Sequence, residues 1–319
     1  MDRKSDIAIR KKYTEDSVII LGDFNVAGHE MNYVFRVSSF GARAGMDKIN
    51  VYFSLLDNTK RENVEVSYDF KPENVIIEEQ SLMVRAENVE ITDSYDCLHA
   101  YINYDSFSMD IDVKSYGTKY DAESHLKNYD PTMLGAYVYP DCTTKGSVIL
   151  SDKYFDVTGN AYVIRKYQFK EANMFTGLLR RTSDDLDYNS MMAFMVLNND
   201  TKIFMGSYGG DKKEDFMIGI SPMGFENKLI FEIQNDIDTY VNRSSKTDDP
   251  LYLAIMSKDE RVNLKFKRKL KKVFTKIVPE DADEQTKINS EIRLYDRFIR
   301  VVGVYNREKV SGYGYIAIS

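Results

Sequence analysis

Apolar residues recur at every second position through much of this chain. In the segment 107–114 the apolar positions are Phe107, Met109, Ile111 and Val113, and polar residues fill the positions between them. This is the period of a β-strand with one face in water. The segments 49–56 and 64–70 repeat the pattern, and the polar sequence DNTKREN between them has the composition of a hairpin turn. The chain is therefore predicted to fold from antiparallel strands.

Both halves of the chain carry this pattern. Segment 190–208 is predicted to form two strands joined at Asn198, Asn199 and Asp200, and further short strands are expected at 228–236, 250–257, 261–270, 292–305 and 314–319. Short strands at intervals of about ten residues favour barrels or sandwiches. With 319 residues, 43% of them hydrophobic, the chain can fill two cores.

No linker rich in Pro, Gly or Ser separates the halves, and the most polar central stretch is 180–190. We place the division just before it. The prediction is an all-β protein of two packed lipocalin-like antiparallel β-barrel domains, the N-terminal one at 1–172 and the C-terminal one at 173–319.

Composition argues against several classes of function. The net charge of -7 gives no global reason to bind nucleic acid or an anionic membrane. The three histidines and two cysteines lack metal-ligand spacing, and no glycine-rich phosphate motif occurs, so no metal or cofactor is expected. No apolar run approaches the length of a membrane span and the N-terminal segment has no apolar core, which predicts a cytoplasmic protein without an integral membrane segment. No pattern points to a particular oligomeric state.

The segment VTGNAYVIRKYQF, 157–169, stands apart from the ordinary strands. Gly159 and Asn160 are interpreted as a turn that leads into an apolar and aromatic strand carrying Arg165 and Lys166. A strand facing water would not be so apolar, and a plain core strand would not carry an arginine at its centre. The segment is therefore predicted to form the wall of a pocket. An arginine pointing outward from a strand edge is the alternative.

Three segments resemble the family that contains carotenoid 1,2-hydratase and AttH-like proteins. EDSVIILGDFNVAGHEMNYVFRV (15–37) is similar to the family's first strand, glycine and return strand. KGSVILSDKYFDVTGNAYVIRKYQF (145–169) is similar to the segment leading into its Gly-x-Ala-Trp-x-Asp-His-x-Trp motif, and VSGYGYIAIS (310–319) to its closing strand. The resemblance implies two lipocalin-like β-barrels packed together.

The chain departs from the family at the positions that carry the chemistry. Tyr162 and Tyr167 stand where the family has tryptophans, Ile164 stands at the acidic position, and Arg165 stands where the histidine would be. Isoleucine cannot donate the proton with which a hydratase would protonate an alkene. Hydration by that mechanism is therefore not expected.

The pericyclases of the same broad fold resemble this situation better, because folding a polyene for ring closure needs little acid or base chemistry. Preorganising a reactive conformer contributes on the order of 7–11 kcal/mol. The resemblance implies an enzyme, a cyclase or isomerase acting on a hydrophobic polyene, isoprenoid or polyketide in a cavity near the domain interface. A non-catalytic carrier of such a ligand is the alternative.

Two groups of residues are candidates for the site. Arg165 and Tyr167 are the candidate catalytic residues, since alternation places them on one face of the strand and Tyr162 on the other. Tyr or Arg donors could polarise a carbonyl group. The candidate ligand-binding residues are Tyr162, His99, Tyr101, Met191 and Phe194. For His99 and Tyr101 a solvated barrel exterior is the competing interpretation.

A second alternative function uses the basic strand 261–276. Its cations alternate with apolar residues, as on a surface that binds RNA or acidic lipid. A solvated sheet face or a protected edge has the same pattern, and the acidic sequence PEDADEQ follows. The cations are Arg261, Lys265, Lys267, Arg268, Lys269, Lys271, Lys272 and Lys276.

Overall fold

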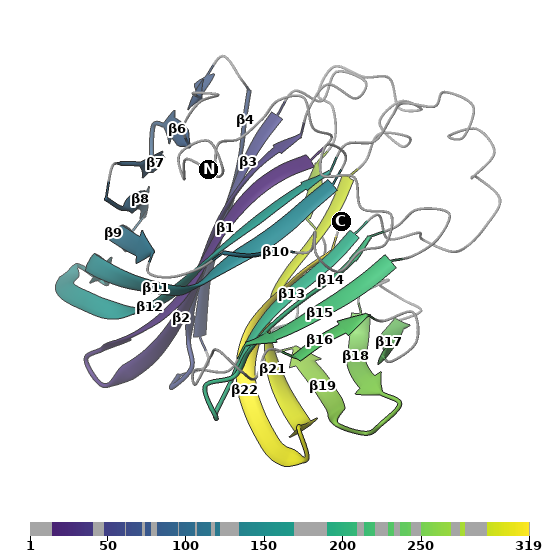
Figure 1. The fold of residues 1–319 in the computed structure, drawn as a ribbon. Coiled ribbons are helices and arrows are strands. Elements are labelled where there is room, and N and C mark those ends of the chain that lie inside the picture. The colour runs from purple at the N-terminus through teal and green to yellow at the C-terminus, as the bar shows by residue number, and fades with distance from the viewer. Residues whose placement is uncertain are drawn as a thin grey trace, which may run out of the picture. The chain divides into compact units, whose positions relative to one another are not determined.

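In the computed structural model, the described residues fold into two antiparallel sheets and no helix (Figure 1). The predicted all-β class is confirmed. β1–β12 belong to one compact unit and β13–β22 to another. The predicted division at 172/173 lies outside the described residues, which are 15–40, 48–60, 62–71, 74–77, 82–94, 96–105, 107–115, 119–121, 134–168, 190–208, 214–220, 229–232, 237–243, 250–268, 275–277 and 292–318.

The first sheet has twelve strands in the order β4-β3-β2-β1-β12-β11-β9-β8-β7-β6-β5, with β10 paired to β11. The pairing of β1 with β12 joins the two ends of the unit's sequence in the middle of the sheet. The strands are β1 Glu15–Val26, β2 His29–Phe40, β3 Lys48–Asp57, β4 Glu62–Phe70, β5 Ile76–Ile77, β6 Met83–Ala86, β7 Val89–Asp93, β8 Leu98–Tyr104, β9 Phe107–Ser115, β10 Tyr120–Asp121, β11 Leu134–Leu150 and β12 Lys153–Gln168.

The second sheet has ten strands in the order β16-β15-β14-β13-β22-β21-β19-β18-β17, with β20 paired to β21. Here too the first and last strands of the unit, β13 and β22, pair. The strands are β13 Ser190–Leu197, β14 Lys202–Tyr208, β15 Glu214–Ile220, β16 Leu229–Glu232, β17 Ile237–Arg243, β18 Pro250–Ser257, β19 Val262–Arg268, β20 Thr275–Ile277, β21 Ile292–Tyr305 and β22 Glu308–Ile318.

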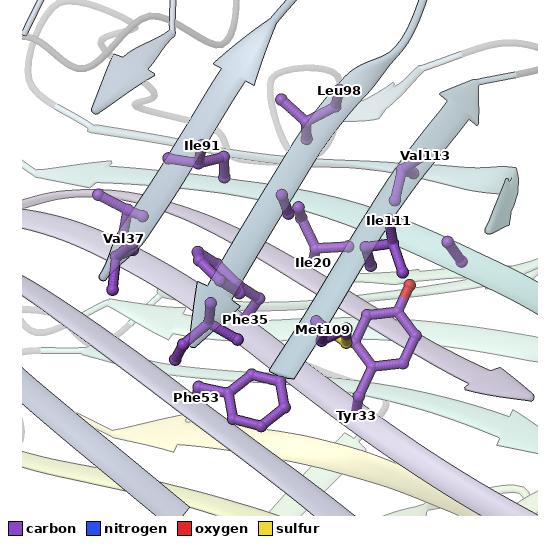
Figure 2. Packing of buried hydrophobic residues seen from close by; sticks show 14 of the residues in the cluster. Ile20, Tyr33, Phe35, Val37, Phe53, Ile91, Leu98, Met109, Ile111 and Val113 are labelled. Carbon is purple, nitrogen blue, oxygen red and sulfur yellow. The ribbon is translucent and has the colours of Figure 1, made fainter. Parts of the chain in front are cut away.

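The first sheet carries a continuous apolar cluster on one face, which we call its interior face (Figure 2). The alternating residues of β3 and β9 lie in this cluster, as predicted from their period of two. Phe53 stacks on Phe107 with ring centroids 4.9 Å apart and meets Phe35 edge-on at 6.3 Å. The second sheet has its own cluster, which includes Met195, Ile203, Leu264, Val301 and Ile316.

Tight turns join several of these strands. Ala27 and Gly28 have positive φ angles of 49° and 80° between β1 and β2, and Ser151 and Asp152 have 49° and 65° between β11 and β12. Two successive positive φ angles match the twist of an antiparallel hairpin. The predicted turns between β3 and β4 and at 198–200 are confirmed. In the part of the chain that the structure describes, no helix is long and apolar enough to cross a membrane.

The predicted turn at Gly159–Asn160 is wrong, because β12 runs through both residues. Gly159 lies opposite Phe24 of β1 in the sheet. A Cβ atom at Gly159 would lie 1.7 Å from the carbonyl oxygen of Asp23. The glycine therefore allows the β1 backbone to come close. Close approach of another backbone is one reason for a glycine within a strand.

We expect Gly159→Ala to lower the free energy of unfolding by about 2–3 kcal/mol, because the β1 backbone must move to admit the methyl group. Urea denaturation followed by circular dichroism measures the change. Gly22→Ala is the comparison variant. A Cβ atom at Gly22 would lie 2.3 Å from the ring of Tyr33, and no backbone atom is among its nearest contacts. An unchanged midpoint for Gly159→Ala would contradict the close approach.

Candidate functional site

Arg165 lies on the interior face of the first sheet. It stands opposite Val18 of β1, which belongs to the apolar cluster, and opposite Tyr137 of β11. Its side chain is only 1% exposed. The alternative of an arginine pointing outward from a strand edge is therefore wrong.

The guanidinium group of Arg165 forms an ion pair with Asp16, which lies on the same face of β1 and is also buried. Nη1 of Arg165 further donates to the carbonyl oxygens of Ser17, at 3.1 Å, and Lys166, at 3.2 Å. A buried guanidinium group needs such partners, because an unpaired buried charge is costly. The contacts with Asp16 and Ser17 tie β12 to β1.

Tyr167 lies beside Arg165, as alternation predicted. The Cζ atom of Arg165 is 5.5 Å from the centroid of the Tyr167 ring, and Tyr167 stands opposite Asp16. Tyr162 lies on the other face of β12. A bulge interrupts β11 between Tyr139 and Cys142, but the register of β12 with β1 runs without a shift, so the two tyrosines stay on opposite faces.

On the face opposite the interior, one polar residue from each of five neighbouring strands falls in register. We call this set the polar row: Lys166 of β12, Ser17 of β1, Ser38 of β2, Asn50 of β3 and Asp69 of β4. The first four are at most 2% exposed, whereas Asp69 is exposed on β4 at the edge of the sheet. Four buried polar side chains in one row need hydrogen bonds.

Hydrogen bonds connect two pairs of neighbours in the polar row. Ser17 Oγ and Ser38 Oγ are 2.8 Å apart. Asn50 accepts from Nη2 of Arg36 at 2.7 Å, and its Nδ2 atom donates to Asp69 at 2.7 Å. The amide of Asn50 thus links the cation of Arg36 to the carboxylate of Asp69, and the row has a carboxylate at one end and the ammonium group of Lys166 at the other.

Apolar side chains border the polar row on the same face. They are buried and lie apart from the interior cluster, because the period of two turns them to the opposite face. Tyr162, a predicted ligand-binding residue, is among them and is 4% exposed. We call this set the apolar block: Ile19, Leu21, Val34, Val138, Tyr162 and Ile164.

The structure does not bring His99 and Tyr101 near the polar row or the apolar block. Both lie on β8 with partly exposed side chains, on the face opposite the apolar cluster. Nδ1 of His99 is 3.1 Å from Asp112 Oδ1, and the register carries that row across to Thr158 of β12. From there to Arg165 the strand rises by roughly 23 Å. This placement of His99 and Tyr101 fits the competing interpretation, a solvated barrel exterior.

Phe194 lies in the second sheet, on the face opposite that sheet's apolar cluster. It stands between Phe204 and Tyr315 in the register, and Tyr315 meets Phe298 with ring centroids 6.4 Å apart. All four aromatic side chains are at most 6% exposed. Met191 lies on β13, and its side chain is outside the described residues.

The described part of the basic strand has one wet face. Val262, Leu264 and Phe266 are buried, and Arg261 and Lys265 are exposed. This fits a solvated sheet face. Lys267 and Arg268 lie on β19 and Lys276 on β20, but their side chains, like Lys269, Lys271 and Lys272 altogether, are outside the described residues.

His29 and Asp57 pair at 2.7 Å and join the β1–β2 hairpin to the turn after β3. Burial would raise the pKa of Asp57, but hydrogen bonds from the backbone N–H of Lys60, from His29 and from the backbone N–H of Thr59 outweigh it and hold the pKa below its ordinary value. Asp57 is therefore a carboxylate in this pair, and its contacts hold the β1–β2 hairpin to the turn after β3. Nowhere among the described residues do three His, Cys, Asp or Glu side chains gather as metal ligands.

Sequence reasoning missed Asp16 and most of the polar row. One signal was available, because Arg36 sits inside the apolar strand YVFRV just as Arg165 sits inside YVIRK. An arginine in such a run needs a buried partner. Which strand supplies the partner is decided by the pairing of β1 with β12, and that pairing joins residues about 150 positions apart in the sequence.

Solved structures with the same fold include an AttH-like protein of Nitrosomonas europaea. It is 10% identical, with a TM-score of 0.70 over 100% of this chain and 96% of that chain. Kievitone hydratase of Nectria haematococca is 13% identical, with a TM-score of 0.70 over 98% of this chain and 91% of that one. CghA is 7% identical, with a TM-score of 0.51 over 96% and 88%.

No protein-family profile and no curated protein matches the sequence. The solved structures confirm the resemblance to carotenoid 1,2-hydratase and AttH-like proteins at the level of the fold. They also confirm the prediction of two lipocalin-like antiparallel barrels. One of these neighbours is named as a hydratase.

Proposed function

We propose that this chain binds a hydrophobic small molecule, of the polyene, isoprenoid or polyketide kind, and acts on it as a cyclase or isomerase. The observation that carries the proposal is the apolar block beside the polar row, on the face of the first sheet opposite its interior. Aliphatic and aromatic side chains with a few placed donors are what such a ligand requires.

The chemistry proposed is conformational. The acidic position of the family motif is Ile164, which belongs to the apolar block, so that position supplies no proton. Holding an extended ligand in a reactive conformation needs surface contact and one or two donors at a carbonyl group. The fold shared with a hydratase supports an enzyme that acts on a small molecule.

Arg165 and Tyr167 take supporting roles in this proposal. The guanidinium group of Arg165 is paired with Asp16 and donates to the backbone of Ser17 and Lys166, which are the first two members of the polar row. It therefore acts as a positioning residue for that row, with Tyr167 packed against it. Tyr162 is the tyrosine that faces the ligand.

The methyl ester of cis-parinaric acid, an uncharged conjugated tetraene, tests the binding step by its fluorescence. We expect it to bind the wild-type chain, and Ile164→Ala to weaken binding about fivefold through lost apolar contact. Val163→Ala is the matched control, because Val163 is the adjacent residue on the interior face. Equal weakening by both variants, or no binding by the wild type, would count against the site.

Chromatography of linear polyenes after incubation tests the chemical step. A cyclase or isomerase converts a substrate into a product of equal mass and different retention. A non-catalytic carrier returns every bound polyene unchanged.

A further inference from the structure

We infer that the second sheet docks on a membrane surface that contains anionic phospholipid. The docking surface is formed by β19, β21 and β22, which lie side by side in that sheet (Figure 1). It is on the face opposite the sheet's apolar cluster, which we call the outer face. This inference is independent of the ligand site proposed for the first sheet.

Partly exposed apolar side chains occupy the middle of the outer face. Val302 and Val304 of β21 and Tyr313 of β22 are among them. The buried rings of Phe298 and Tyr315 end this exposed stretch along the two strands. Aliphatic side chains beside a tyrosine suit the boundary between lipid head groups and acyl chains.

Three exposed cations surround Val302. Lys265 of β19 stands opposite Val302 in the register. Arg300 lies two residues before Val302, and Lys309 of β22 stands opposite Val304. With strands about 4.8 Å apart and a rise of about 3.4 Å per residue, the Cα atoms of all three cations lie within roughly 8 Å of Val302. None of the three forms an ion pair with a residue that the structure describes.

Acidic residues on the outer face lie farther from Val302. Asp238 of β17 is three strand spacings away, and Asp296 is six residues away on β21; their side chains are outside the described residues. Both separations are roughly 16–20 Å between Cα atoms, about twice the Debye length in physiological salt. The described acidic residues at the nearby end of the sheet lie in or beside turns, together with cations: Asp200, Asp259, Glu260 and Glu308, with Lys258, Arg261 and Arg307.

The surface around Val302 is therefore locally positive, although the chain has a net charge of -7. Lys and Arg side chains at a bilayer surface attract anionic head groups, and apolar side chains between them enter the boundary region. RNA would bind the cations but leave the valines without a partner, because interfaces with nucleic acid are more polar. The combination of charge and apolar surface thus favours a membrane.

Sedimentation with lipid vesicles tests the inference. We expect the chain to bind vesicles of phosphatidylcholine with one-third phosphatidylserine, and not vesicles of phosphatidylcholine alone. Lys265→Ala and Arg300→Ala should each weaken binding about fivefold, as the loss of one cation at an anionic surface implies. Val302→Ala should weaken it about threefold through lost apolar contact. Lys145→Ala is the matched control, because Lys145 is an exposed lysine on a strand of the first sheet.

Several outcomes would overturn the inference. They are no binding to anionic vesicles, equal binding to both kinds of vesicle, and equal weakening by Lys145→Ala and Lys265→Ala. Tighter binding to single-stranded RNA than to anionic vesicles would assign the surface to nucleic acid instead. Circular dichroism checks that each variant folds, and Arg300→Ala carries the test if Lys265→Ala does not. Tetraene binding at the first sheet is measured separately, so either proposal can fail alone.

Discussion

Asp16→Asn should lower the free energy of unfolding by about 3 kcal/mol, because it leaves the buried guanidinium group of Arg165 without its carboxylate. The variant keeps the shape of the side chain, so the loss measures charge rather than packing. Urea denaturation at pH 7 gives the value from the midpoint and slope.

Two controls define this prediction. Glu90→Gln removes the carboxylate of an exposed pair, in which Glu90 accepts from Arg85 at 2.7 Å, and should change stability little, since exposed pairs contribute little. The double variant Asp16→Leu with Arg165→Met should recover much of the loss, because apolar residues of similar volume often replace a buried pair without cost. A loss for Asp16→Asn no larger than that for Glu90→Gln would show that the pair is not buried in solution.

Phe53→Ala should lower the free energy of unfolding by about 4 kcal/mol. Its ring is fully buried, stacked on Phe107 and edge-on to Phe35, and removing it opens a cavity in the interior cluster. Figure 2 shows Phe53 beside Phe35 in this cluster. Thermal and urea denaturation measure the effect. Tyr154→Ala is the control, because Tyr154 is 63% exposed and should tolerate truncation. Similar losses for the two variants would mean that the cluster is not tightly packed.

The period of two predicted some of the strands and their interior faces, among them β3 and β9. Phe53 of β3 and Met109 of β9 alternate with polar residues, and both lie in the cluster. Alternation does not reveal close approach between distant strands. The sequence therefore indicates a turn at Gly159, because glycine and asparagine are common in turns. The close approach of the Asp23 backbone is what requires the glycine.

The candidate site was predictable only in part, for a related reason. Arg165 and Tyr167 were predicted because an arginine is unusual in an apolar strand, and their shared face follows from alternation. Their part in a ligand site stays a prediction. The partner Asp16 lies in the strand EDSVII, where an acidic residue near the start looks like an ordinary exposed end. The polar row gathers one residue from each of five strands, so no local pattern marks it.

The Arg165–Asp16 pair has a consequence for how β12 finds its place beside β1. A slip of one residue would turn Arg165 away from Asp16 and Lys166 into the interior cluster, so the polar residues of β12 oppose it. A slip of two residues keeps every side chain on its face, and alternation does not oppose it at all. It would move Arg165 about 7 Å from Asp16 and set Gly159 away from the Asp23 carbonyl. The ion pair and the glycine therefore select among alignments that hydrophobicity treats as equal.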